Sequence, residues 1–205
     1  VTSREYPRNS TADYSICHTN REVPIDFYEN VTLDPSDVVL GDWVLLSGFG
    51  CTSWGRGLDG QYRVGRARVR RVPSGSNNDV VASDGATLCS GDSGGPAWTL
   101  LANGDRSKMF SVNSRSDTRR TSYLSSLFTS EGRRLFDAYS QRFPGDLICG
   151  VHASAPKCRN AKPAEPVEYE IDGDAAVLKV RVMPGFESDK EALRVMLEQA
   201  VKGVE

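Results

Sequence analysis

The sequence predicts a mostly β domain that ends in a helix and is followed by a small ββα extension. Over the first two-thirds of the chain, short strand-like runs alternate with turn signals about every ten residues. An amphipathic stretch that begins at Ser130 predicts a helix, which Pro144-Gly145 ends. Beyond a Pro-rich stretch, a hairpin turn at 172–174 precedes a second helix with a capping box and an apolar stripe.

The strands of the β-rich part are predicted from apolar runs and from alternation. They are Val38–Leu40, Trp43–Ser47, Gln61–Val72, a hairpin of Ala97–Leu101 with Lys108–Val112, and Thr121–Phe128. Within the long run, Arg66, Arg68 and Arg70 alternate with smaller residues. We interpret this arginine row as the solvated face of a half-buried strand, rather than as a binding surface.

Changes of pattern divide the chain into three predicted segments. Residues 1–144 form the β-rich domain with its helix, 145–166 a cysteine-containing linker, and 167–205 the ββα extension. The apolar stripe of the last helix has two interpretations. It packs on its own hairpin or on the β-rich domain, or it docks a partner.

The composition is that of an ordinary globular protein. The chain has 205 residues, of which 39% are hydrophobic and 25% charged, with a net charge of −2. This balance gives no case for a nucleic-acid partner or for an anionic membrane surface. Apolar stretches such as Trp43–Leu46 are far too short to span a bilayer, so we expect no membrane span.

The five cysteines predict disulfides rather than a metal site. They are Cys17, Cys51, Cys89, Cys149 and Cys158. Since no pair has the CxxC spacing of a zinc site, we expect no metal. Disulfides imply an oxidising compartment, and we expect a secreted or periplasmic protein. The odd cysteine is free or pairs with another chain.

The stretch from Leu88 to Trp98, LCSGDSGGPAW, carries the strongest functional signal. A serine flanked by small residues lies on a tight turn, where its hydroxyl projects and a carbonyl group can approach the backbone. The amides of Gly91 and Ser93 can then donate to a developing oxyanion, which is usually the largest single catalytic contribution. The alternative is a glycine-rich surface turn without chemistry.

The hexapeptide GDSGGP resembles the nucleophile loop of the chymotrypsin/trypsin family of serine endopeptidases. The resemblance implies that Ser93 is the nucleophile, that Gly91 and Ser93 form the oxyanion hole, and that Asp92 is the activation-pocket carboxylate. It extends over roughly residues 5 to 142 through the segment 6–17, SGFG at 47–50, Val112-Asn113-Ser114, Tyr123 and the helix from Ser130.

This family folds as two six-stranded β-barrels with the active site between them. The resemblance therefore implies that residues 1–144 are the C-terminal part of such a domain, comprising the second barrel and the C-terminal helix. Within the segment 6–17, Asp13 takes the role of the aspartate that orients the catalytic histidine. The implied reaction is hydrolysis of a protein or peptide substrate through an acyl-enzyme.

The chain departs from the family in lacking a histidine at the expected place. The family's histidine precedes the aspartate, whereas the two histidines here are His18 and His152, both after Asp13. We expect the base to come from an N-terminal protease segment, either as a separate chain or as a part omitted from this sequence. The alternative is a catalytically inactive, protease-like binding or regulatory module.

The substrate pocket also departs from that of trypsin. Thr87, followed by Leu88, stands where trypsin-like members have an aspartate that neutralises a substrate cation. The pocket residues implied by the resemblance are Thr87, Leu88, Asn113, Ser114, Arg115 and Thr121. We expect small, polar or acidic residues before the scissile bond, because an unpaired cation in a pocket is costly. Asp84 is the residue that could instead favour lysine or arginine.

In the family a cystine ties the nucleophile loop to the loop beyond the pocket wall. Here the second loop, 114–122, contains no cysteine, so we expect Cys89 to pair with Cys149 or Cys158. A second alignment makes Gly150-Val151-His152 the pocket wall and Cys158 the partner of Cys89. It would place a histidine in the pocket, as in glutamate-specific relatives.

Overall fold

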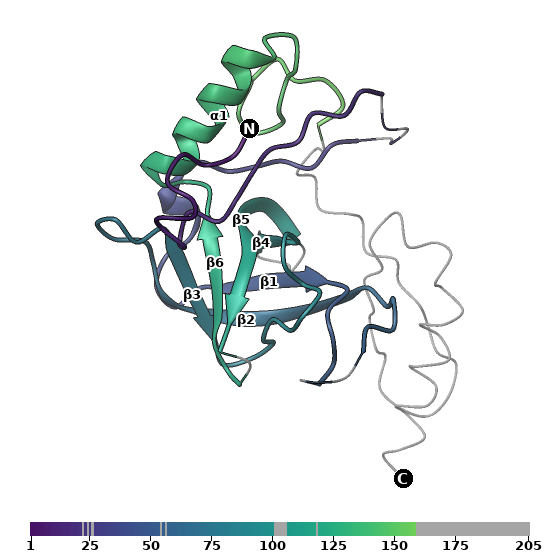
Figure 1. Cartoon of the computed structure of the whole chain (residues 1–205), viewed down its shortest axis with the longest axis vertical. Helices are drawn as coiled ribbons and strands as arrows, with labels where there is room; N and C mark the ends of the chain where they lie inside the picture. Colours follow the sequence, from purple (N-terminus) through teal and green to yellow (C-terminus); the bar gives the residue numbers. More distant parts are fainter. Residues whose placement is uncertain are drawn as a thin grey trace, which may run out of the picture. The chain divides into compact units, whose positions relative to one another are not determined.

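Six antiparallel strands close into a barrel in the computed structural model of the chain (Figure 1). The structure describes residues 1–158 apart from 22, 24, 26, 54, 56, 101–105 and 118. The strands are β1 (Trp43–Gly48), β2 (Arg63–Arg71), β3 (Asp79–Ser83), β4 (Pro96–Leu100), β5 (Arg106–Ser116) and β6 (Ser122–Ser126). Their order around the barrel is β1-β2-β3-β6-β5-β4.

The barrel is closed by the pairing of β1 with β4, in which Leu45 lies opposite Trp98 and Leu46 opposite Ala97. Alternation along each strand sends one set of side chains inward, as a small barrel requires. On β2 the pattern is clear, since Ala67 and Val69 are fully buried. The interior consists of Val38, Val44, Leu46, Ala67, Val69, Val80, Ala82, Leu88, Ala97, Phe110, Leu124 and Phe128.

The arginine row of β2 lies on the solvated face, as predicted. Arg66, Arg68 and Arg70 are all exposed. Arg70 forms an ion pair with Asp84, and the Nε of Arg68 donates to the carbonyl of Gly41. The interpretation of this row as an ordinary solvated strand face is therefore confirmed.

Two strand predictions differ from the structure. Residues 38–40 are not a strand, because the 3₁₀ helix η1 (Pro35–Asp37) runs directly into Val38. The Asp34 side chain accepts the Ser36 amide and so caps this turn. Conversely, β3 was not predicted, because its five residues are short and follow a polar turn.

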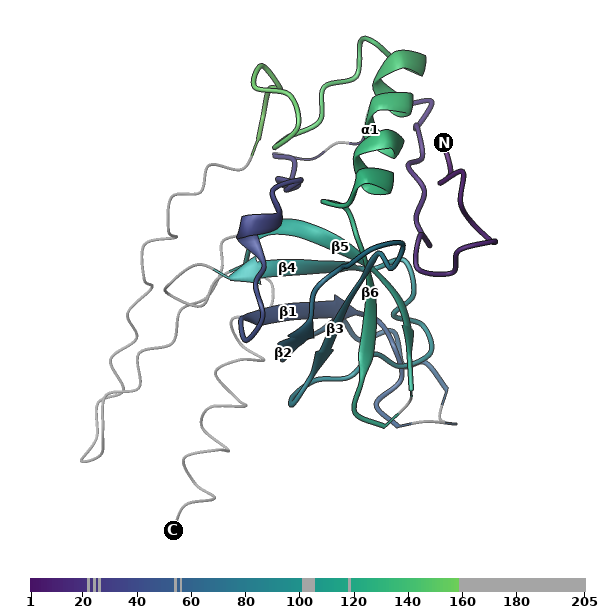
Figure 2. The same ribbon diagram turned by 90° about the vertical axis from the view of Figure 1, so that its left-hand side faces the viewer.

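Helix α1 (Ser130–Arg142) follows the barrel, and Figure 2 shows it beside the N-terminal segment. Its N-cap is Thr129, whose hydroxyl accepts the amide of Gly132. The N-terminal segment is joined to the helix by the Ser3 hydroxyl, which donates to buried Glu131 at 2.6 Å. A second apolar cluster lies between them, formed by Ala12, Tyr14, Leu127, Leu135 and Phe136.

The two disulfides join Cys51 to Cys89 and Cys149 to Cys158. The expectation that Cys89 pairs with a tail cysteine was therefore wrong. The loop after β1 passes directly beside the nucleophile loop, which brings Cys51 to Cys89 with their Cα atoms 5.3 Å apart. The tail cysteines are nine residues apart and pair locally. Cys17 is a free, exposed thiol.

Residues 145–158 pack on the barrel unit, since the amide of Val31 donates to the carbonyl of Cys149 at 2.9 Å. Contacts group Val1–Ala161 into one compact unit. The proposed boundaries at 144 and 166 stay predictions, and the hairpin and last helix of the extension lie outside the described residues. In the described part, no helix is long and apolar enough to cross a membrane.

The prediction of a mostly β fold is confirmed. The chain forms a closed six-stranded antiparallel barrel followed by a helix, which is the architecture expected for the second barrel of a chymotrypsin-like fold.

Candidate active site

The nucleophile loop, residues 87–95, connects β3 to β4 and lies against β5. Three backbone hydrogen bonds fix its last turn: the Gly94 amide donates to the carbonyl of Asn113, the Asn113 amide to that of Gly95, and the Gly95 amide to that of Asp92. Gly95 has no room for a Cβ, which would lie 2.8 Å from the carbonyl oxygen of Ser47. This close packing leaves Ser93 exposed at the end of the loop.

Two amides of the loop have no acceptor in the part of the chain that the structure describes. The Asp92 amide donates to the carbonyl of Cys89, whereas the Gly91 and Ser93 amides donate to none of the described residues. Gly91 has a φ of +98°, a conformation that strongly favours glycine. A Cβ on Gly91 would also lie 2.7 Å from Leu58 Cδ2. The loop therefore leaves available the two donors that the sequence predicts for an oxyanion hole.

Ser114, on β5, joins the two predicted catalytic residues. Its hydroxyl donates to Asp13 Oδ2 at 2.9 Å, and its carbonyl accepts the Ser93 hydroxyl at 3.5 Å. Asp13 lies 80 residues before Ser93 in the sequence. The fold thus brings both Asp13 and Ser93 into contact with Ser114, one at its hydroxyl and the other at its carbonyl. Sequence analysis assigned Ser114 only to the pocket wall.

Arg115, the residue after Ser114, contacts both the Ser114 hydroxyl and a buried aspartate. Its guanidinium forms an ion pair with Asp79, whose side chain is fully buried, and lies 3.4 Å from the Ser114 hydroxyl. It also lies over the ring of Tyr123. Burial raises the pKa of Asp79, and the charge of Arg115 opposes that shift. Sequence analysis missed Asp79, because an aspartate within a short valine-rich strand shows no local signal of its partner.

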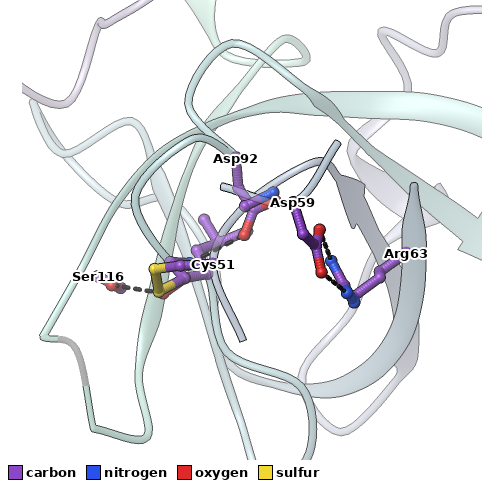
Figure 3. The surroundings of a disulfide bond; sticks show 8 residues. Cys51, Asp59, Arg63, Asp92 and Ser116 are labelled. Atoms are coloured by element: carbon purple, nitrogen blue, oxygen red, sulfur yellow. Dashed lines mark hydrogen bonds and ion pairs between the residues drawn. A yellow bond between two sulfur atoms is a disulfide. The ribbon is translucent and has the colours of Figure 1, made fainter. Parts of the chain in front are cut away.

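Asp92 points away from Ser93, toward the loop after β1. Its Oδ1 accepts the Gly50 amide at 2.7 Å and its Oδ2 accepts the Cys89 amide at 2.9 Å. Figure 3 shows this carboxylate beside the Cys51–Cys89 disulfide. A Cβ on Gly48 would lie 2.2 Å from Asp92 Oδ1, and one on Gly50 2.3 Å from its Cγ. The two glycines of SGFG therefore make room for the carboxylate.

The predicted pocket residues separate into two groups. Leu88 is buried; its amide donates to the Ser122 hydroxyl, and its carbonyl accepts the Ser116 hydroxyl. Thr87 and Thr121 are half-buried at the same end of the barrel. By contrast, the Asn113 side chain is buried and donates to the carbonyl of Ser47. Only the backbone of Asn113 can therefore border a pocket.

The loop that follows β5 is organised by Asp117. One oxygen of its side chain accepts the amides of Arg119, Arg120 and Thr121, each at 2.9 Å. These hydrogen bonds hold the pKa of Asp117 well below its usual range, led by the amide of Thr121. The carboxylate is therefore ionised at neutral pH and is committed to the shape of its own loop.

Neither histidine lies at Ser93. His18 Nδ1 is 2.7 Å from Asp146 Oδ2, and its ring stacks on Phe143. His152 Nδ1 accepts the Ile148 amide, and its Nε2 lies 3.2 Å from the Ser140 hydroxyl. The alternative alignment that made His152 part of the pocket wall is wrong, since Cys158 pairs with Cys149. In the described part of the chain, the structure therefore brings together the predicted nucleophile Ser93 and the predicted orienting Asp13, and no histidine contacts either of them.

No family model matches the chain, and no curated protein matches it. Among solved structures, one match is a mutant of human heparin binding protein (CAP37), with 19% sequence identity and a TM-score of 0.48. The match covers 62% of this chain and 56% of that chain, so this chain spans little more than half of that protein's length. A match of this kind assigns neither a family nor a function.

Proposed function

We propose that this chain supplies the nucleophile, the orienting aspartate and the oxyanion hole of a serine endopeptidase, and that a histidine from an N-terminal protease segment completes it. The observation that carries the proposal is the position of Ser114 between Asp13 and Ser93. An imidazole that reached both groups would have its Nδ1–H directed at the carboxylate and its Nε2 at the hydroxyl.

In the proposed reaction, the Ser93 oxygen forms a bond to the carbonyl carbon of the scissile peptide, and its proton passes to the incoming histidine. The Gly91 and Ser93 amides stabilise the oxyanion. The C–N bond then breaks, and the histidine returns the proton to the leaving amine. Water repeats the cycle on the acyl-enzyme and releases Ser93. No metal or organic cofactor takes part.

We propose small, polar or acidic residues before the scissile bond. The argument rests on the absence of a carboxylate at Thr87 and on the commitment of Asp84, which is exposed and paired with Arg70. A substrate guanidinium would lose its hydration in the pocket without gaining a partner. Arg115, paired with Asp79, is the basic group nearest to Ser114 on the same strand.

Two disulfides support a secreted or periplasmic location, because thiols stay reduced in most cytosols.

A catalytically inactive binding or regulatory module is the second candidate. The observation that favours it is that both histidines make their contacts elsewhere, His18 with Asp146 and His152 with Ser140. Such a module would use the surface around Ser93 to bind a protein or peptide without cleaving it.

A fluorophosphonate probe distinguishes the two functions. The protein isolated from its native source, with any co-purifying segment retained, should be labelled at Ser93, and Ser93→Ala should abolish the labelling. The matched control is Ser90→Ala, since Ser90 is an exposed serine in the same loop whose carbonyl, not its hydroxyl, makes the structural contact. Labelling that persists in Ser93→Ala would exclude the endopeptidase mechanism.

A further inference from the structure

We propose that the Cys51–Cys89 disulfide and the Asp92 carboxylate act as one clamp that holds the nucleophile loop in its working shape. In this proposal Cys51 and Cys89 are positioning residues, and reducing their disulfide releases the loop. The inference rests on the proposed function, because the loop it positions is the one that carries Ser93.

The clamp is evident from which amides Asp92 accepts. One belongs to Gly50, the residue next to Cys51, and the other to Cys89 itself. The disulfide therefore covalently joins the two backbone segments that donate to one carboxylate. A further hydrogen bond, from the Cys51 amide to the carbonyl of Ser90 at 3.0 Å, lies beside the sulfur atoms. Figure 3 shows the carboxylate and the disulfide side by side.

In the part of the chain that the structure describes, the partners of Asp92 are these backbone amides. Among the described residues, no lysine or arginine forms an ion pair with Asp92; the nearby guanidinium of Arg63 is held by Asp59 (Figure 3). Gly48 and Gly50 close around the carboxylate so tightly that a Cβ on either would collide with it. Asp92 is thus satisfied by charge-assisted hydrogen bonds from backbone alone.

The loop geometry depends on both parts of the clamp. Asp92 immediately precedes Ser93 and immediately follows Gly91, so a rotation of its backbone would move both oxyanion-hole amides. Without the disulfide, the segment at 48–51 can move away from Cys89, and Asp92 can keep one amide but not both. Oxyanion donors lose most of their effect when displaced by about an ångström.

The two parts are also coupled thermodynamically. If the disulfide stabilises the hydrogen bonds of Asp92, then Asp92 must stabilise the disulfide by the same factor. The redox step is a thiol–disulfide exchange: a dithiol reductant gives two electrons and two protons, Cys51 and Cys89 become thiols, and the reductant becomes a disulfide.

Amide hydrogen exchange on the chain itself tests the clamp without any need for the missing histidine. The variant Cys17→Ser/Cys149→Ser/Cys158→Ser retains Cys51–Cys89 as its sole disulfide. Reduction of this variant with dithiothreitol should increase the exchange rates of the Gly50 and Cys89 amides at least about tenfold, measured residue by residue by NMR. The Asn113 amide, bonded to Gly95 outside the clamp, serves as the internal reference. Unchanged exchange at Gly50 and Cys89 would overturn the proposal.

The reciprocal measurement uses Asp92→Asn in the same variant. It should shift the dithiothreitol concentration at half-reduction of Cys51–Cys89 downward about tenfold, because an amide side chain cannot accept both backbone donors. Asp59→Asn is the matched control, since Asp59 lies close by but pairs with Arg63 and the Gln61 amide rather than with the clamp. Equal midpoints for the two variants would contradict the coupling.

Fluorophosphonate labelling of the native protein separates this inference from the proposed function. If exchange and redox midpoint respond as expected but Ser93 is not labelled, the clamp stands and the endopeptidase mechanism fails. If Ser93 is labelled at the same rate before and after reduction of Cys51–Cys89, the mechanism stands and the clamp is not a positioning device.

Discussion

The nucleophile loop and the surroundings of His18 differ in how their polar groups are hydrogen-bonded. Around His18, the imidazole stacks on Phe143 at 4.3 Å, and Asp146 accepts both His18 Nδ1 and the Tyr139 hydroxyl. In the nucleophile loop, the Gly91 and Ser93 amides have no described acceptor, and the Ser93 hydroxyl makes one long hydrogen bond. The polar groups around His18 are paired with one another, whereas the two amides of the nucleophile loop have no acceptor among the described residues.

This difference identifies which histidine environment is structural. Asp146 has its pKa lowered first by the Tyr139 hydroxyl and then by His18, so its charge is already engaged. Burial, followed by the hydrogen bond to Asp146, raises the pKa of Tyr139 to about 12. The His18 cluster (His18, Tyr139, Phe143 and Asp146) joins the N-terminal segment to the tail. In the proposed function, the base that completes the Ser93 site comes from outside this cluster.

The largest expected effects come from adding a methyl group to one glycine of the nucleophile loop and, for comparison, to one glycine of the tail that packs on Val31. Gly91→Ala should lower Ser93 labelling of the native protein about 100-fold, because its amide is a proposed oxyanion donor and its φ of +98° strongly disfavours a Cβ. Gly150→Ala, where a Cβ would lie 1.9 Å from the Val31 carbonyl oxygen, should cost about 1–3 kcal/mol of unfolding free energy. Labelling rates and urea unfolding of both variants test this.

The difference between the two regions would be contradicted if Gly91→Ala and Gly150→Ala had the same effect on labelling. Equal losses of labelling in Gly91→Ala and Gly150→Ala, after correction for the folded fraction, would mean that Gly91 acts only through stability.

Ser114→Ala sharpens the comparison within the nucleophile region. The substitution removes the hydroxyl that donates to Asp13 and keeps the carbonyl that accepts from Ser93. We expect about a tenfold loss of labelling, as for a lost hydrogen bond to a charged group. Ser114→Thr retains the hydroxyl and should recover most of the rate. Failure of Ser114→Thr to recover it, in a protein that unfolds like wild type, would exclude the positioning of Asp13.

Histidine substitutions test the opposite region. His18→Gln and His152→Gln should leave Ser93 labelling within about twofold of wild type. The reason is that His18 pairs with Asp146 and His152 with Ser140, so neither ring contacts Ser93. A small loss of stability is expected for His18→Gln, since the pair with Asp146 is partly exposed. Loss of labelling in either variant would identify the base within this chain.

The smallest effect on the site is expected from tyrosine ionisation. The pKa values of Tyr14 and Tyr139 are both raised to about 12, chiefly by burial. A raised pKa favours the neutral form in the folded chain, so the contribution of each to stability is full below pH 10 and is lost as the pH rises toward about 12. Absorbance titration should show a late-ionising class, reduced in Tyr139→Phe. Titration of all tyrosines near pH 10 would contradict this.

The parts that the sequence predicts well are local. GDSGGP contains Ser93, its glycines and Asp92 within six adjacent residues, so the resemblance to a nucleophile loop can be seen in the sequence itself. The alternation along β2 likewise predicts which side chains enter the barrel. In both cases the residues that matter are neighbours in the chain, and their geometry follows from backbone periodicity.

The parts that the sequence did not predict depend on contacts between distant segments. Cys51 meets Cys89 because the loop after β1 lies beside the nucleophile loop, although 38 residues separate the two cysteines. Arg115 pairs with Asp79 across 36 residues, at an irregularity in the pairing of β5 with β6. The sequence pattern around each residue does not indicate its distant partner, so neither the disulfide nor the ion pair could be assigned before the barrel was known.

We propose that the base that acts on Ser93 comes from outside the described residues. The most direct measurement is fluorophosphonate labelling of the native protein, with the labelled residue and any co-purifying segment identified by mass spectrometry. We predict labelling at Ser93 together with a histidine-bearing segment, and at least about a 1,000-fold slower reaction for the isolated 205-residue chain. Rapid labelling of the isolated chain at Ser93, or none in the native protein, would contradict the claim.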